Sequence, residues 1–256
     1  MTRNSFLKVL DGGAIIIRGQ PKNGPPPERT IGFAEIEPFR MARRPGATNP
    51  GSNDDPWAWE AREFLRKMLI GKSVLCLISH KVASGREYGQ VLFGSNDPDK
   101  AENVAVKLLS EGLAKVRDNC SDPLYNDAQE SAKSGLKGVW SGEAESAHKR
   151  NITWEVENTR QLVDRMGGQP VDAIIENVRD GSTVRAFLLP DFYHVTVMMA
   201  GMRVIFSKIS FRVAILILDF IVVSSLENGT RWKTLRLPRR LRLRSPLLHR
   251  IPSTPT

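Results

Sequence analysis

Phe6-Leu-Lys-Val-Leu-Asp-Gly-Gly-Ala-Ile-Ile-Ile-Arg18 reads as two apolar β-strands joined by a tight turn at Asp11-Gly12-Gly13. Asp and Gly favour tight hairpin turns, and the β-branched residues that follow the turn favour a strand. The pattern recurs 169 residues later, where Val9-Leu-Asp-Gly-Gly-Ala-Ile15 returns as Val178-Arg-Asp-Gly-Ser-Thr-Val184. A repeat of this kind indicates two copies of one folding unit.

The pattern downstream of the first hairpin predicts a small β-barrel with helices. Three further strands are expected at 31–36, 73–79 and 87–93. A first helix is expected to begin after Asp55, a good N-cap that precedes Pro56, and to stop at Gly71. Two more helices are expected at 101–110 and 127–136. Five short strands with segregated helices are typical of an OB-type barrel in the α+β class.

These patterns divide the chain into four segments. We expect one complete domain at 1–147, a polar linker at 148–169, the first three strands of a second copy at 170–203, and a divergent basic tail at 204–256. The strands of the second copy are expected at 171–177, 184–189 and 194–200. The tail has no barrel pattern, and we expect it to be disordered or poorly packed.

The net charge of +9 is unevenly distributed. Residues 204–256 hold 10 Lys and Arg against 2 Asp and Glu, whereas residues 1–203 hold 27 against 26. The basic character therefore belongs to the tail and says little about the partners of the main body. With 41% hydrophobic and 25% charged residues, the composition argues against wholesale disorder, collagen and a polytopic membrane protein.

Cysteine content and the start of the chain bear on the compartment. Two cysteines, Cys76 and Cys120, exclude a disulfide scaffold and a four-cysteine zinc site. The first residues hold no apolar run of the length that a secretory signal needs. The expected compartment is the cytosol, where both cysteines stay reduced.

Three interpretations of the tail are open. Residues 213–225 are apolar, but a bilayer span needs about 20 residues and Asp219 interrupts this run. Residues 231–250 carry only basic charge and could bind RNA non-specifically. The third interpretation, which we favour, is a sequence without selected function that comes from an unusual isoform or an error in the gene prediction. We therefore expect no membrane association.

Several dense motifs of the main body carry a family resemblance. They are Gly24-Pro-Pro-Pro-Glu-Arg29, Met41-Ala-Arg-Arg44, Pro56-Trp-Ala58, Glu63-Phe-Leu-Arg-Lys67, Gly71-Lys72, Gly85-Arg-Glu-Tyr-Gly89, Glu111-Gly-Leu-Ala114 and Gly138-Val-Trp140. The chain resembles the nuclease-like repeats of the Tudor staphylococcal nuclease (Tudor-SN) family over residues 6–203. The resemblance stops near Arg203, so we expect an N-terminal fragment of such a protein.

The resemblance implies a function in RNA biology. We expect an RNA- and protein-binding scaffold module related to a component of the RNA-induced silencing complex (RISC), with links to small-RNA regulation, splicing and transcriptional coactivation. The implied location is the cytoplasm, with the nucleus as a second site. The alternative is a Ca²⁺-dependent endoribonuclease that acts on small or double-stranded RNA. No cofactor is expected for the scaffold, and Ca²⁺ is expected for the nuclease.

The resemblance also places catalytic roles at positions that are degenerate here. Nucleases of this fold use converging carboxylates to hold Ca²⁺, two arginines to hold the phosphate, and a glutamate to activate water. Gly13 stands where the second Asp of the motif Asp-Gly-Asp-Thr would bind the metal, and Gln90 replaces the second arginine. Arg29 is displaced by about one position, and Glu37 precedes Pro38 instead of following it.

Asp11 and Glu35 are the two metal-ligand candidates that remain, because Glu35 could replace the aspartate that the third strand usually carries. In the second copy, Ser182 replaces the metal-binding aspartate and Met198 falls near the first arginine. We therefore assign no catalytic residue and expect no measurable cleavage by this pocket.

Nucleic-acid contacts are sought among cationic and aromatic side chains. The candidates are Arg40, Arg43, Arg44, Trp59 and Arg86. A solvated loop is the competing interpretation of the three arginines at 40–44. The four histidines are widely separated, so we interpret each as an ordinary histidine.

Overall fold

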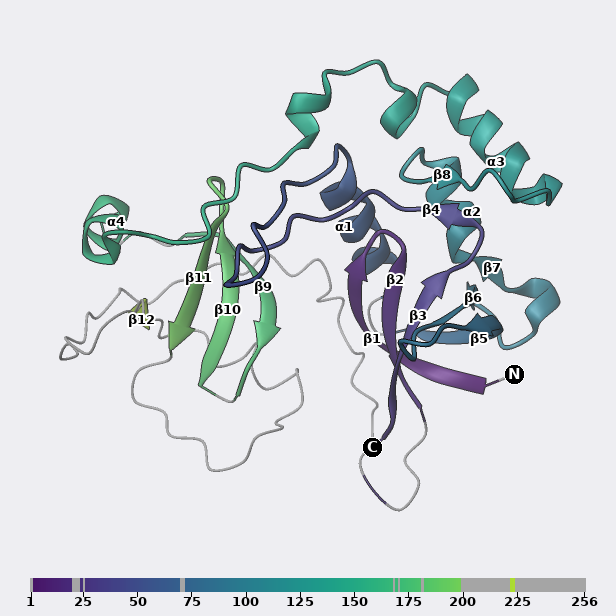
Figure 1. Cartoon of the computed structure of the whole chain (residues 1–256), viewed down its shortest axis with the longest axis horizontal. Coiled ribbons are helices and arrows are strands. Elements are labelled where there is room, and N and C mark those ends of the chain that lie inside the picture. The colour runs from purple at the N-terminus through teal and green to yellow at the C-terminus, as the bar shows by residue number, and fades with distance from the viewer. Residues whose placement is uncertain are drawn as a thin grey trace, which may run out of the picture. The chain divides into compact units, whose positions relative to one another are not determined.

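The computed structural model describes residues 2–19, 24, 26–69, 72–167, 169, 171–180, 182–198 and 222–223 (Figure 1). The chain separates into two compact units, Met1–Arg150 and Asn151–Thr256, and each is described by itself.

The strands of the first unit are β1 (Thr2–Asp11), β2 (Ala14–Arg18), β3 (Glu28–Phe33), β4 (Ile36–Glu37), β5 (Ser73–Lys81), β6 (Glu87–Phe93), β7 (Glu102–Asn103) and β8 (Lys115–Val116). Its helices are α1 (Ala58–Leu69), α2 (Val104–Ser110) and α3 (Pro123–Ser134), with short 3₁₀ turns η1 (Pro98–Lys100), η2 (Gly138–Trp140) and η3 (Glu145–His148).

One curled sheet forms the centre of the first unit. Its strand order is β3-β2-β1-β5-β6-β7, and β3 also pairs with β6, so that the sheet closes on itself. The closing pair is parallel and joins Ile31 to Glu87 and Phe33 to Gly89. Strand alternation places Ile15 and Ile17 in the interior of this barrel. The prediction of an OB-type α+β fold is confirmed.

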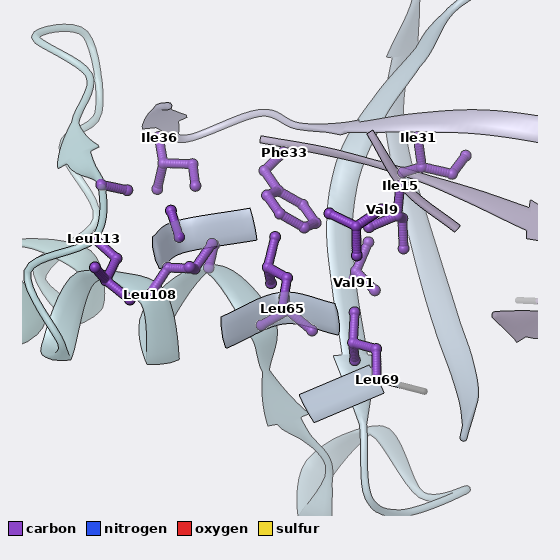
Figure 2. Packing of buried hydrophobic residues seen from close by; sticks show 14 of the residues in the cluster. Val9, Ile15, Ile31, Phe33, Ile36, Leu65, Leu69, Val91, Leu108 and Leu113 are labelled. Carbon is purple, nitrogen blue, oxygen red and sulfur yellow. The ribbon is translucent and has the colours of Figure 1, made fainter. Parts of the chain in front are cut away.

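The interior is filled by strand residues and by one face of α1. Phe33 lies beside the strand residue Val9 and next to the helix residue Leu65, in one core cluster (Figure 2). The barrel therefore needs the apolar face of α1 to complete its core.

The predicted helices are present, but their ends differ from the predicted ones. α1 begins at Ala58, because Trp57 before it has a left-handed backbone with φ of 66°. α2 begins at Val104, three residues later than predicted, because the Asn103 side chain accepts the backbone N–H groups of Ala105 and Val106. α3 begins at Pro123, four residues earlier than predicted, because Asp122 caps it. The rule of Asp before Pro that located α1 thus also locates α3.

A buried ion pair marks the end of the first unit. The guanidinium of Arg150 donates through Nε to Asp54 Oδ2 at 2.6 Å and through Nη2 to Asp54 Oδ1 at 2.9 Å. The two side chains are 5% and 0% exposed. His148 stacks on Trp57 with ring centroids 3.2 Å apart. The compact unit therefore runs to Arg150, three residues beyond the predicted boundary at 147.

The second unit contains α4 (Thr159–Met166), β9 (Ala173–Val178), β10 (Thr183–Leu188), β11 (Tyr193–Met198) and β12 (Val222–Val223). The strand order is β12-β11-β10-β9. The three strands predicted from the repeat are therefore present, and their inward residues form a small core of Val184, Ala186, Leu188, Val195 and Val197.

The first hairpin of each unit has the same hydrogen bond in its turn. The Asp11 Oδ1 accepts the Gly13 N–H at 2.9 Å, and Asp180 Oδ1 accepts the Ser182 N–H at 2.8 Å. The hydrogen bonds from Ser182 hold the pKa of Asp180 below its usual value. This likeness agrees with the repeat, although the assignment of 170–203 as a truncated second copy stays a prediction.

The segment 148–169 contains a helix, where a linker was predicted. α4 is capped at its start by Asn158, whose side chain accepts the Gln161 N–H, and ends at Gly167 with a left-handed backbone. Leu162 is buried on it. Our expectations for the tail at 204–256 lie outside the described residues, apart from Val222–Val223. Among the described residues, no helix is long and apolar enough to cross a bilayer.

We expect Arg150→Ala to destabilise the segment 1–150 strongly. The variant leaves the carboxylate of Asp54 buried without its partner, a change that typically costs about 3–5 kcal/mol. Arg18→Ala is the matched control, because the pair of Arg18 with Glu28 is exposed and such pairs contribute at most about 1 kcal/mol. Urea unfolding measures both, and wild-type 1–150 should unfold in one cooperative transition. A non-cooperative transition of the wild-type segment, or equal effects of the two variants, would contradict this domain boundary.

Candidate functional site

The turn between β1 and β2 has no room for a carboxylate at position 13. A Cβ built on Gly13 would lie 2.3 Å from Cγ and 2.6 Å from Cβ of Pro38. Any larger side chain at this position would collide with the proline ring, which follows β4. The inverted order of Glu37 and Pro38 therefore places an apolar ring where a metal-binding aspartate would extend.

Arg29 is engaged by a carboxylate of the neighbouring strand. Its Nε donates to Glu87 Oε2 at 2.9 Å, and its Nη2 makes a second, short contact with the same oxygen. The side chains of Arg29 and Glu87 are 31% and 16% exposed. A phosphate would have to compete with Glu87 for this guanidinium.

Glu35 is half-buried and lies near the phenol of Tyr125. Its Oε2 is buried and makes no hydrogen bond among the described residues. Tyr125 is fully buried, and its hydroxyl accepts a hydrogen bond from Asn103 Nδ2 at 3.0 Å. Burial raises the pKa of Tyr125 to about 12, the Glu35 carboxylate adds to this rise, and the Asn103 hydrogen bond opposes it. Glu35 thus interacts with the core of the domain.

Glu37 and Gln90 do not complete a hydrolytic site. Glu37 is exposed on β4 and borders an open hollow of about 460 Å³ that is also lined by Pro38, Arg40, Arg117, Asp118 and Asn119. Gln90 lies on β6 opposite Leu77, and its amide carries no charge to offset that of a phosphate.

These residues do not fit the Ca²⁺ site that the fold family implies. Gly13 supplies no side-chain oxygen, and the ring of Pro38 fills the adjoining space. The Asp11 carboxylate already accepts the Gly13 N–H. A Ca²⁺ ion needs six to eight oxygen ligands, and no group of three or more His, Cys, Asp or Glu in the described part of the chain could hold a metal.

The arginines at 40–44 lie on an ordered loop. The Arg40 N–H donates to Asp55 Oδ2 at 2.7 Å, and Arg43 and Ser52 pair through two backbone hydrogen bonds. Arg43 and Arg44 are exposed, while Arg40 borders the hollow beside Glu37. The loop therefore presents its cations from a defined backbone. The role of these arginines in nucleic-acid binding stays a prediction.

Trp59 packs against two arginines of the first unit. The guanidinium carbon of Arg150 lies 3.9 Å from its ring centroid and that of Arg62 lies 5.2 Å away. Both are cation–π contacts within the first unit. Trp59 therefore takes part in the packing around Arg150 at the end of the first unit, and its contact with nucleic acid stays a prediction.

Arg86 belongs to an aromatic cluster on the β5–β6 hairpin. Its guanidinium lies 5.7 Å from the Tyr88 ring centroid, and the His80 ring stacks on Tyr88 at 5.1 Å with planes 6° apart. His80 is exposed and Tyr88 half-buried. Gly32 allows this arrangement, because a Cβ there would lie 2.6 Å from Cε1 of Tyr88.

His80 is a residue that our reading of the sequence missed. His80 and Tyr88 are directly paired across the hairpin. Counting outward from Ser84 as the centre of the turn pairs His80 with Tyr88, which is the signal that we missed when we interpreted His80 as an ordinary histidine.

We expect Gly13→Asp to destabilise the first unit by about 1–3 kcal/mol, the usual range for overpacking. Gly46→Asp is the matched control, because a Cβ at Gly46 meets no atom within 4 Å. Pairing Gly13→Asp with Pro38→Gly should recover part of the lost stability. Urea unfolding measures these differences. A Gly13→Asp variant as stable as the wild type would mean that Pro38 does not close this space.

We expect Tyr125 to titrate at a higher pH than a tyrosine of the unfolded chain. Its phenol ionises near pH 10 in the unfolded chain and near 12 in the folded one. Stability from this group is therefore complete below pH 10 and is lost as the pH rises towards 12. Ultraviolet absorbance of phenolate measures the titration, and Glu35→Gln should lower the pKa of Tyr125. An unchanged pKa in that variant would remove Glu35 from the environment of Tyr125.

The chain is similar to large curated proteins. It is 46% identical over 201 residues to staphylococcal nuclease domain-containing protein 1 of Drosophila melanogaster, covering 77% of this chain and 22% of that protein. It is 38% identical over 229 residues to Ribonuclease TUDOR 2 of Arabidopsis thaliana, covering 79% and 22%. Staphylococcal nuclease domain-containing protein 1 of Schizosaccharomyces pombe is 28% identical over 219 residues, covering 78% and 23%. The chain spans about a fifth of the length of these relatives.

A family model, described as staphylococcal nuclease homologue, matches residues 38–142. This range holds α1, β5, β6, α2 and α3 and begins after the positions of Gly13, Arg29 and Glu35. The barrel, this match and the curated relatives agree with the resemblance seen in the motifs. The chain therefore belongs to the Tudor staphylococcal nuclease family.

Proposed function

We propose that the first unit binds RNA without cleaving it and serves as a scaffold module. The observation that carries this proposal is the contact of Pro38 with Gly13, which leaves no space for a metal-binding side chain at the turn. Removing even one preorganised electrostatic contact from an active site lowers the rate by about 10²–10³. Here the aspartate and the second arginine are absent, and Glu87 engages the remaining arginine.

The cluster on the β5–β6 hairpin is the surface that we propose for RNA. The exposed imidazole of His80 offers a stacking face for a base, and Arg86 and Lys81 supply positive charge. Aromatic stacking with cations close by is the usual way to bind single-stranded nucleic acid without strong sequence preference. The exposed Arg43 and Arg44 would extend contacts with the phosphate backbone.

The wider role follows from the family. We propose that the longer protein to which this sequence corresponds acts with proteins of the RNA-induced silencing complex and of the transcription or splicing machinery, in the cytoplasm and also in the nucleus. The relatives named above contain several times the length of this chain, so their partners are proposals here.

The competing function is a Ca²⁺-dependent endoribonuclease. Its support is the name of two relatives from Arabidopsis thaliana, Ribonuclease TUDOR 1 and Ribonuclease TUDOR 2. The residues of the first unit argue against it, because the carboxylates and arginines of the turn do not converge on a common point with room for a metal.

We expect the segment 1–150 to bind a single-stranded RNA oligonucleotide and to leave it intact when Ca²⁺ is added. This segment lacks the basic tail, which would bind RNA by itself. His80→Ala should weaken binding by at least about fivefold, since one stacked base contributes about 1–3 kcal/mol. Arg86→Ala should also lower the salt dependence by about one phosphate contact. Fluorescence anisotropy measures affinity, and gel electrophoresis of the RNA measures cleavage.

Lys107→Ala is the matched control, because Lys107 lies on α2 and pairs with Glu102. It should bind RNA like the wild type. Equal affinity of the His80→Ala and Arg86→Ala variants and the wild type would exclude this surface. Ca²⁺-dependent cleavage that Glu35→Gln abolishes would establish the endoribonuclease instead.

A further inference from the structure

The outer edge of β11 is covered by a segment that precedes its own sheet in the sequence. Thr153 forms a parallel bridge with Tyr193, and the Thr153 carbonyl accepts the His194 N–H at 2.9 Å. On its other side, β11 pairs with β10 in an antiparallel ladder in which His194 lies opposite Phe187. The segment 151–154 thus lies against the edge of β11 that faces away from β10.

Trp154 fixes this segment on the sheet. Its ring centroid lies 5.3 Å from that of His194 and 6.1 Å from that of Phe187. Phe187 is 4% exposed. The indole therefore packs on a cross-strand pair, and the hydrogen bond of Thr153 and the ring contacts of Trp154 hold adjacent residues of one segment.

The first unit shows what normally covers this edge. There β3 is the third strand of the meander, and its outer edge is taken by β6 in parallel pairing from Ile31 onward. The repeat relates Ile15 to Val184, and their partners across the ladder are Ile31 and Val197. At Val197 and Met198 the edge of β11 meets β12, which runs antiparallel. The outer edge of β11 thus pairs with two separate segments, 151–154 and β12. The outer edge of β3 pairs with the single strand β6.

An open edge of β11 would be well suited to pair with another copy of itself. The strand reads Tyr-His-Val-Thr-Val-Met over 193–198 and holds no Asp, Glu, Lys, Arg or Pro. Charged residues and proline are the devices that protect exposed edges from pairing with other chains. Because β12 already pairs with Val197 and Met198, the edge that 151–154 protects is that of residues 193–196, and two copies of it could align antiparallel without charge repulsion.

We propose that residues 151–154 form an intramolecular cap on β11, and that this cap prevents the edge from pairing with a second copy of the chain. The cap is independent of RNA binding by the first unit. When the cap is displaced, the His194 N–H loses its acceptor and becomes available to a strand of another molecule. The self-association of the chain is therefore controlled by the anchoring of Trp154.

The test is Trp154→Ala in the full chain, compared with Trp154→Phe and with Glu157→Ala, which changes an exposed residue just after the cap. Hydrogen exchange followed by NMR reports the His194 amide, and analytical ultracentrifugation reports association. In Trp154→Ala we expect His194 to exchange at least about tenfold faster and dimers or larger species to form as the concentration rises. Trp154→Phe and Glu157→Ala should behave as the wild type.

The Val195 amide is the internal reference, because alternate residues of an antiparallel strand point to opposite neighbours and Val195 faces β10. We expect its protection to be unchanged in Trp154→Ala. Loss of protection at both amides would show that Trp154 holds the whole sheet together, which overturns a detachable cap. Unchanged exchange at His194, or faster exchange with no change in association, would also overturn the proposal.

Discussion

Closure of the barrel between β3 and β6 is the contact on which the first unit depends. It joins β3, at one end of the sheet, to β6, the last strand but one at the other end. Gly32 on β3 makes this approach possible, because a Cβ there would lie 2.6 Å from Cε1 of the Tyr88 ring on β6. Gly89 has the same role between β6 and β5, because a Cβ there would lie 2.0 Å from the Leu77 carbonyl oxygen. Once the sheet is closed, Ile31 and Phe33 face inward and α1 completes the core.

The same closure determines what the candidate site can do. Glu87, which pairs with Ile31 at the closing point, carries the carboxylate that engages Arg29. Tyr88, which lies across from Gly32 in the closing pair, is also the ring that His80 and Arg86 contact on the β5–β6 hairpin. A residue that would hold phosphate in a nuclease is thus used within the barrel, while the adjoining hairpin presents exposed rings and cations. This arrangement favours binding over hydrolysis.

The sequence predicts the strands well, because alternation and turn chemistry are local. The first hairpin and its repeat follow from residues within a few positions of each other, and Asp55-Pro56 predicts the start of α1 to within two residues. The start of α3 was missed because its first apolar contacts come after Pro123, although Asp122 was available as a cap. The role of Trp59 could not be predicted, because Arg150 is far away in the sequence and only folding brings its guanidinium onto the indole. The helix α4 was missed because it is only eight residues long and lies in a polar stretch, with Leu162 as its one buried residue.

Two departures from the nuclease pattern that look independent in the sequence are one contact in the structure. Gly13 lacks the carboxylate, and Pro38 stands out of order 25 positions later, yet the proline ring occupies the space beside the glycine. Either change alone would leave a strained or half-empty turn, since an aspartate collides with the proline and a smaller residue at 38 would leave a gap. Hydrolysis needs converging charges that this packing excludes. RNA binding needs exposed rings and cations, which tolerate a closed turn elsewhere on the barrel, so the fold can lose the first ability and keep the second.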